Sequence, residues 1–323
     1  MSRRLCRASI ALAAWLGLAP VAAAHGSGSA SQPTDPLGIA LAWRLDLPII
    51  VGLVLASVGY VAAARAVDRA HPGNPWSRAR TASFVAGLAA IGLALVSPID
   101  ALSETLLTVH MVQHLLLTAV APPLLAASGI ATLALRSASN GSRDRLLLPI
   151  LHGRVVAVLT FPLVGWLGFP LAMWASHVSG LYNLALLDDG VHAVEHLLYL
   201  GAALLFWWPM FSPDPLRWRL HPAVRLFGLV MQMPPMSFLA ITIVSAPAPL
   251  YSAYLGRPDA FGVDALTDQR IAGSLMWLTN DVAFLVAAAF LIAIWLRHEA
   301  AETRRIDARL ARSRRDEQAR REI

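Results

Sequence analysis

Apolar segments of similar length alternate with short polar segments along most of the chain. A helix needs roughly 20 apolar residues to cross the hydrocarbon core of a bilayer. The segments predict an all-α, polytopic membrane protein with seven transmembrane helices, at residues 46–66, 81–98, 104–127, 155–176, 190–209, 224–245 and 271–296. We therefore expect residues 46–296 to form a single seven-helix membrane domain.

The two ends of the chain differ in pattern from the membrane domain. Residues 1–24 combine early arginines, a short apolar run and a small-residue motif ending at Ala24, which predicts a cleaved signal peptide; an uncleaved anchor helix is the alternative. Residues 25–45 begin with a stretch rich in Gly, Ser and Pro and predict a periplasmic arm. Residues 297–323 hold nine arginines and six acids. We expect them to form a cytoplasmic tail, a solvated helix near anionic headgroups, with a docking site for a partner as the alternative.

Composition supports an integral membrane protein. Hydrophobic residues make up 57% of the chain and charged residues only 14%, whereas soluble domains carry roughly a quarter charged residues. This composition excludes a disordered chain and a disulfide scaffold. The single cysteine, Cys6, lies in the predicted signal peptide, so the mature protein has neither a disulfide nor a thiolate ligand.

The basic residues define a topology rather than a nucleic-acid surface. The net charge is +6 and all 26 basic residues are arginines, but they lie between the apolar segments. With the amino terminus outside, twenty arginines fall in the inner loops and tail, and three fall outside: Arg44, Arg257 and Arg270. The positive-inside rule then predicts a membrane protein with an amino terminus outside the cytoplasm and a cytoplasmic carboxyl terminus, which binds lipid and no nucleic acid.

Two histidine pairs fall at matched depths in the predicted third and fifth helices. The pattern H-x-x-[QE]-H-L-L occurs twice, with His110 and His114 in one copy and His192 and His196 in the other. Both helices enter from the outside, so the copies are parallel, and residues at i and i+4 share one helix face. At 1.5 Å per residue, His110 and His196 each lie about 9 Å below the outer surface. This arrangement predicts a metal site; interhelical hydrogen bonding is the alternative for each histidine.

Further candidate ligands lie in the remaining helices. His177 closes the outer end of the fourth, Met236 belongs to a Met233–Met236 segment with two prolines in the sixth, and Asp281 lies deep in the seventh. Two prolines predict a kink that shapes the site or serves packing alone. Asp281 is a candidate ligand or proton shuttle, whereas Met236 could equally be apolar packing. Imidazoles and thioethers without thiolate favour copper or zinc, and thioether softness favours copper.

The order of these motifs resembles the CtaG family of cytochrome c oxidase assembly factors, in its seven-span type. The resemblance covers nearly all of residues 40–296. The motifs that carry it are His110-Met111-Val112-Gln113-His114, His192 and His196 with Leu197-Leu198-Tyr199, Phe206-Trp207-Trp208-Pro209, Met233-Pro234-Pro235-Met236, and Asp268-Gln269-Arg270-Ile271-Ala272-Gly273 with Met276-Trp277.

The resemblance implies a non-enzymatic inner-membrane protein that is needed to build an active haem-copper oxidase of the respiratory chain. Its partners would be the oxidase subunits, and copper delivery is the expected role. The leading hypothesis is a periplasmic-side copper site formed by the two histidine pairs, with Asp281, Met236 and His177 as supporting or transfer ligands. The alternatives are a copper permease, a haem-binding membrane cytochrome with His110 and His196 as axial ligands, and an intramembrane zinc hydrolase.

Overall fold

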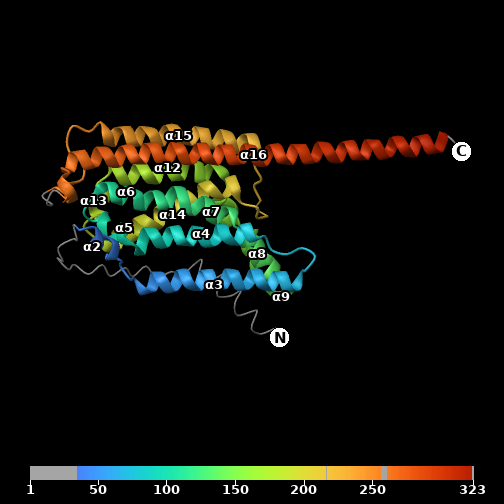
Figure 1. The fold of residues 1–323 in the computed structure, drawn as a ribbon, viewed down its shortest axis with the longest axis horizontal. Helices are drawn as coiled ribbons and strands as arrows, with labels where there is room; N and C mark the ends of the chain where they lie inside the picture. The colour runs from blue at the N-terminus through green and yellow to red at the C-terminus, as the bar shows by residue number, and fades with distance from the viewer. Residues whose placement is uncertain (1–34, 216, 256–259, 322–323) are drawn as a thin grey trace.

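The computed structural model describes residues 35–215, 217–255 and 260–321, and within them the fold is all-α with no strands. The predicted all-α class is therefore confirmed for this part of the chain, and the predicted signal peptide lies outside it. Figure 1 shows the long helices side by side with nearly parallel axes. The helices are α2 (Pro36–Leu41), α3 (Leu47–Ala70), α4 (Arg78–Val96), α5 (Pro98–Ser103), α6 (Leu107–Leu115), η1 (Leu116–Val120), α7 (Ala121–Ala127), α8 (Ile130–Ser137), α9 (Asn140–Ser142), η2 (Arg143–Leu147), α10 (Leu148–Leu151), α11 (Arg154–Leu159), α12 (Pro162–Val178), α13 (Leu181–Ala185), α14 (Asp189–Phe211), α15 (Pro222–Val244), η3 (Ser252–Tyr254), η4 (Ala260–Gly262) and α16 (Ala265–Arg321).

Six of the described helical stretches are long and apolar enough to cross a membrane, so the predicted count of seven is not confirmed. They are Leu47–Ala70, Arg78–Val96, Leu107–Ser137, Asp189–Phe211, Pro222–Val244 and Ala265–Leu310. Several such helices in one chain indicate a multi-pass membrane protein.

The predicted fourth helix, residues 155–176, is interrupted. It is divided into α11, which ends at Leu159, and α12, which has 17 residues and begins at Pro162. Phe161 adopts an extended conformation because proline disfavours the helical conformation in the residue before it. Helix α12 nevertheless lies within the bundle, packed against α14 and α15.

The predicted third helix is also irregular. Residues 116–120 form a π-helical turn, η1, between α6 and α7. Pro122 and Pro123 come shortly after this turn and have no N–H groups to donate to it. The regular pattern of α-helical hydrogen bonds therefore cannot continue there. Gly129 then ends the stretch with a positive φ of 71°, a conformation that glycine adopts at little cost.

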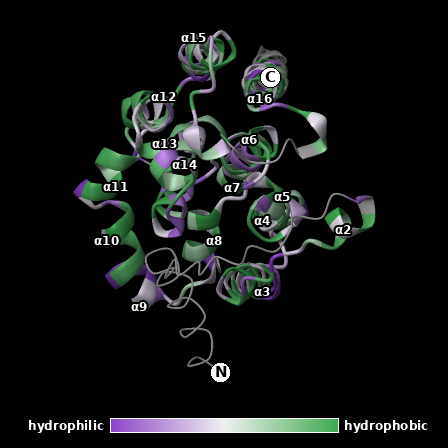
Figure 2. Cartoon of the chain, turned by 90° about the vertical axis from the view of Figure 1, so that its left-hand side faces the viewer, coloured by the Kyte–Doolittle hydropathy of each residue, from purple (hydrophilic) through white to green (hydrophobic). Residues whose placement is uncertain are grey.

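The apolar core has two parts, and the outer surface is apolar as well. One core cluster joins residues of α6, α12, α14, α15 and α16, and the other joins residues of α3, α4, η1, α7 and α8. Large hydrophobic side chains such as Leu55, Phe238 and Leu278 are more than half exposed, and Figure 2 shows hydrophobic residues on the outward faces of the bundle. Outward apolar side chains of this kind are expected where lipid surrounds the helices.

Helix α16 continues far beyond the bundle. It has 57 residues and includes both the predicted seventh helix and most of the predicted tail. In Figure 1 it leaves the bundle at the end opposite to the start of α6. The tail is thus helical to Arg321, while its predicted place near lipid headgroups stays a prediction.

Candidate metal centre

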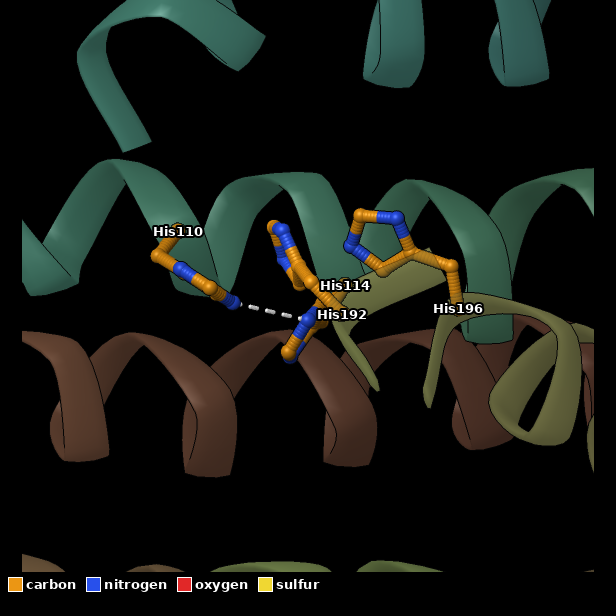
Figure 3. Close-up of side chains that lie close together, drawn as sticks. All are labelled: His110, His114, His192 and His196. Atoms are coloured by element: carbon orange, nitrogen blue, oxygen red, sulfur yellow. Dashed lines mark hydrogen bonds between the residues drawn. The ribbon is translucent and has the colours of Figure 1, made fainter. Parts of the chain in front are cut away.

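Four histidines from two helical stretches converge in the interior of the bundle. One ring nitrogen each from His110, His114, His192 and His196 lies within 4.8 Å of the others. Figure 3 shows the imidazoles of α6 and α14 turned toward one another. The structure therefore brings together the two pairs that the repeated motif singles out.

The four imidazole rings lie close enough together to bind a single metal ion. The ring centroids are 4.3 Å apart within the His110–His114 pair and 4.2 Å apart within the His192–His196 pair. Across the helices, the centroids are 5.1 Å apart for His110 and His192 and 5.3 Å apart for His114 and His196. A tetrahedral ion holds imidazole nitrogens about 3.3 Å apart, so small side-chain rotations would complete such a site.

Three of the four histidines are buried, His196 is partly exposed, and imidazole is a neutral donor to a metal. His110 and His114 are 1% and 2% exposed, and His192 is 9% exposed. The Nε2 atoms of His110 and His114 lie 2.9 Å apart, a distance at which a proton or a cation must lie between them. A buried cation is costly unless ligands replace its hydration shell, and four imidazoles can do so.

A tyrosine from another segment orients one of the four rings. Tyr254 donates its hydroxyl proton to the carbonyl oxygen of Ser103 at 2.8 Å and lies 3.2 Å from Nδ1 of His110. Because a phenol has one proton, this arrangement requires His110 to donate from Nδ1. Nε2 of His110 then presents a lone pair to the cluster, as metal-ligating histidines usually do.

Two further tyrosines cover the cluster, Tyr182 from the short helix α13 and Tyr251 from the segment between α15 and η3. Tyr182 lies with its ring centroid 5.4 Å from that of His110, and Tyr251 packs on Tyr182 at 4.4 Å. Burial raises the pKa of both hydroxyl groups above that of a free tyrosine, so they stay neutral. They close the site without adding charge.

His177 lies beside the four histidines but is not one of the group. Its ring centroid is 6.5 Å from that of His114, and its Nδ1 lies 2.9 Å from the carbonyl oxygen of Met173. That carbonyl can only accept, so Nδ1 carries the proton and Nε2 has the lone pair. Nε2 is buried and has no hydrogen-bond partner among the described residues.

The structure does not place Asp281 or Met236 in the histidine group. Asp281 accepts a hydrogen bond at 3.3 Å from the hydroxyl of Ser237. Met236 is 1% exposed and lies in the apolar cluster that includes Leu239 and Phe284. Helix α15 runs unbroken through Pro234 and Pro235. A ligand role for Asp281 and Met236 therefore stays a prediction.

The polar residue inside each histidine motif anchors its helix, a role that the sequence did not reveal. Gln113 donates to the carbonyl oxygen of Ala94 at 2.9 Å and to Asp100 at 2.8 Å. Glu195 accepts from the hydroxyl of Ser176 and, at 3.1 Å, from that of Tyr199. The Q/E position thus faces a neighbouring helix while the histidines face each other.

Asp268 and Gln269 hold the amino-terminal end of α6 and the loop before α16. The carboxylate of Asp268 accepts from the backbone N–H groups of Leu107 at 2.6 Å and Thr108 at 3.1 Å. It caps α6, which has no N-cap side chain of its own. Gln269 accepts from the N–H of Leu250 at 2.6 Å and holds the loop before α16. His110 therefore lies one turn beyond an anchored helix end.

A multi-pass helical membrane protein with a buried four-histidine cluster is the class that these features define. The family model described as "Cytochrome c oxidase caa3 assembly factor (Caa3_CtaG)" matches residues 58–298. The chain belongs to this family, and the resemblance drawn from its motifs is confirmed.

Similar curated proteins are known from mycobacteria. An uncharacterized protein of Mycobacterium leprae is 27% identical over 278 residues, which are 83% of this chain and 41% of the relative. Uncharacterized proteins of Mycobacterium bovis and Mycobacterium tuberculosis are each 25% identical over 276 residues, with the same coverage. The chain thus spans less than half the length of these relatives. No solved structure matches the chain.

Proposed function

We propose that this protein is an inner-membrane assembly factor for a haem-copper cytochrome c oxidase and binds copper through His110, His114, His192 and His196 for delivery to that enzyme. The observation that carries the proposal is the convergence of four imidazole nitrogens within 4.8 Å. Membership in the assembly-factor family supports the biological role. The role is non-enzymatic, with the oxidase subunits as partners.

The donor set favours Cu(I) over a divalent ion. All four donors are neutral, and the group includes neither carboxylate nor thiolate. The charge of the bound ion would therefore remain uncompensated in a buried site. Because the cost of burying an ion rises steeply with its charge, a singly charged ion is easier to hold there. Imidazole is a good ligand for copper.

His177 is suited to pass the ion on rather than to hold it. Its Nε2 is buried, carries a lone pair and has no partner among the described residues. The centroid of its ring lies 6.5 Å from that of His114. We infer that copper moves between the four-histidine cluster and His177 during loading or release. Met236 and Asp281 remain the further candidates for this path.

The proposed copper site faces the periplasm. The cluster lies near the ends of α6 and α14 that are opposite to the exit of the α16 extension (Figure 1). The inner loops and the tail carry the excess of arginine, which supports a cytoplasmic position for that extension. Delivery from this side would reach oxidase copper centres that are assembled outside the cytoplasm.

Metal analysis and an absorption spectrum of the detergent-purified protein test the proposal. We expect about one copper per chain, the content of one four-coordinate site, and no Soret band. Replacing both histidine pairs by alanine should remove the copper and abolish oxidase activity in cells. The matched control replaces the exposed histidines His71 and His152 and should change neither.

Other results would overturn the copper-delivery role. Normal oxidase copper content in cells that carry the four-alanine variant would contradict it. A Soret band would instead identify a haem-binding cytochrome. Copper accumulation in cells that express the protein, with no effect on oxidase activity, would identify a permease.

A further inference from the structure

A second site lies at the opposite end of the bundle from the histidines. A cavity of about 370 Å³ is lined by residues from the end of α14, the loop after it, the start of α15, and α16. Trp208 in this cavity is 16 residues after His192 on the same helix, which places the two about 24 Å apart. In Figure 1 the yellow loop after α14 lies where the α16 extension leaves the bundle.

Two guanidinium groups line the cavity without an acidic partner. Arg219 and Arg225 are both among its lining residues. Arg225 donates from Nε to the carbonyl oxygen of Leu220 and from an Nη to that of Met210, each at 3.1 Å. These bonds fix the group and use two of its five N–H donors. Among the described residues, neither arginine forms an ion pair.

The one carboxylate in the cavity wall is occupied elsewhere. Asp214 accepts from the backbone N–H of Thr132 at 2.7 Å, from the Thr132 hydroxyl at 2.6 Å and from the N–H of Ala131 at 3.3 Å. It therefore caps α8 and does not neutralise the arginines. The cavity keeps an excess of positive charge.

Two tryptophans line the same cavity. The indole Nε1 of Trp208 is buried and has no hydrogen-bond partner among the described residues. In contrast, Nε1 of the neighbouring Trp218 donates to the carbonyl oxygen of Ala157 at 2.7 Å. The indole ring of Trp208 is therefore part of the cavity wall, and its N–H is enclosed by protein rather than open to a ligand.

The remaining wall is apolar and open toward the lipid side. Phe211 and Ile294 line the cavity, and Ile294 is 48% exposed. Tryptophan residues such as Trp208 and Trp218 are typical of the headgroup level of a membrane, and basic pockets between helices on the cytoplasmic side bind anionic lipid headgroups. An inorganic anion would have no use for the apolar wall.

We propose that this cavity binds one anionic phospholipid. Its phosphate oxygens accept hydrogen bonds from Arg219 and Arg225, and its acyl chain lies along Phe211 and Ile294. The site is separate from the copper chemistry and is independent of the proposed function.

Lipid retention by the purified full chain tests this proposal. Native mass spectrometry with phosphatidylglycerol and phosphatidylcholine should show one retained phosphatidylglycerol, bound roughly fivefold or more tightly than the zwitterionic lipid. Arg219→Gln should remove most of this preference. Arg217→Gln is the matched control, because Arg217 lies in the same loop and stacks on Trp218 at 5.4 Å but does not line the cavity. It removes the same charge and should leave the preference intact.

A second variant separates the specific site from general attraction to negative charge. Arg225→Gln removes the second guanidinium group that lines the cavity, so retention of phosphatidylglycerol should fall by a few-fold. Equal losses from Arg217→Gln and Arg219→Gln would overturn the proposal. So would equal retention of the two lipids, or displacement of phosphatidylglycerol by millimolar inorganic phosphate, which would identify a free-anion site.

Discussion

The two histidine helices carry the same motif but are held in different ways. Helix α14 has 23 residues and caps its own start, where Asp188 accepts from the N–H of Val191. Helix α6 has nine residues, receives its cap from Asp268 of α16, and runs directly into a π-helical turn. One half of the cluster therefore depends on local structure, and the other half depends on residues about 160 positions away. The same ligand pattern does not require the same support.

Removal of either histidine pair should have the largest effect, because each helix supplies half of the proposed copper ligands. Both His110→Ala/His114→Ala and His192→Ala/His196→Ala delete two of four donors, so each should weaken copper binding by more than about 100-fold. Competition with a copper chelator measures this. If one double variant keeps its affinity, the ion is held by a single helix and the shared site is wrong.

Tyr254, which contacts His110, should affect copper affinity more than Tyr199 on α14. Tyr254→Phe removes the group that sets the tautomer of His110 and should weaken copper binding about tenfold. Tyr199→Phe removes the hydroxyl contacts to Glu195 and His177 but keeps the ring that packs on His114 at 4.8 Å, and should leave affinity within about threefold. Equal effects in the chelator assay would contradict the assigned tautomer.

The packing of α14 against α12 can be broken at one glycine. A Cβ at Gly165 would collide with the backbone of Leu205 and Phe206, so Gly165→Ala should destabilise the protein by about 1–3 kcal/mol. Gly168→Ala on the same helix meets no atom within 4 Å and should be neutral or stabilising. Thermal unfolding in detergent measures both. A neutral Gly165→Ala would show that α12 and α14 can separate freely.

Loss of the helix caps should give the smallest changes in stability. The two variants show whether the cap on α6 or the cap on α14 contributes more. Asp268→Ala leaves two backbone N–H groups of α6 without an acceptor and should cost about 1–2 kcal/mol. Asp188→Ala removes one such bond from α14 and should cost about 0.5–1 kcal/mol. The same unfolding assay checks the order. The reverse order would mean that α6 holds its start without α16.

The features that follow from helical periodicity could be predicted from the sequence. The i, i+4 spacing places two imidazoles on one face, and apolar length places both pairs at similar depth, so the four histidines could be named in advance. The break before Pro162 was missed because hydropathy does not record it. The roles of Asp268 and Glu195 were missed because their partners lie on other helices. Asp281 was predicted as a ligand from its depth in the seventh helix. Depth does not determine which side chains a residue contacts, and Asp281 contacts Ser237.

Helix α16 is long enough to cross a membrane and to continue well beyond it. One uninterrupted helix carries Asp268, which holds the first turn of α6, and extends about 80 Å to the arginine-rich end. No hinge divides the described part of this rod. The residue that caps α6 and the arginine-rich end of the chain therefore belong to one continuous helix.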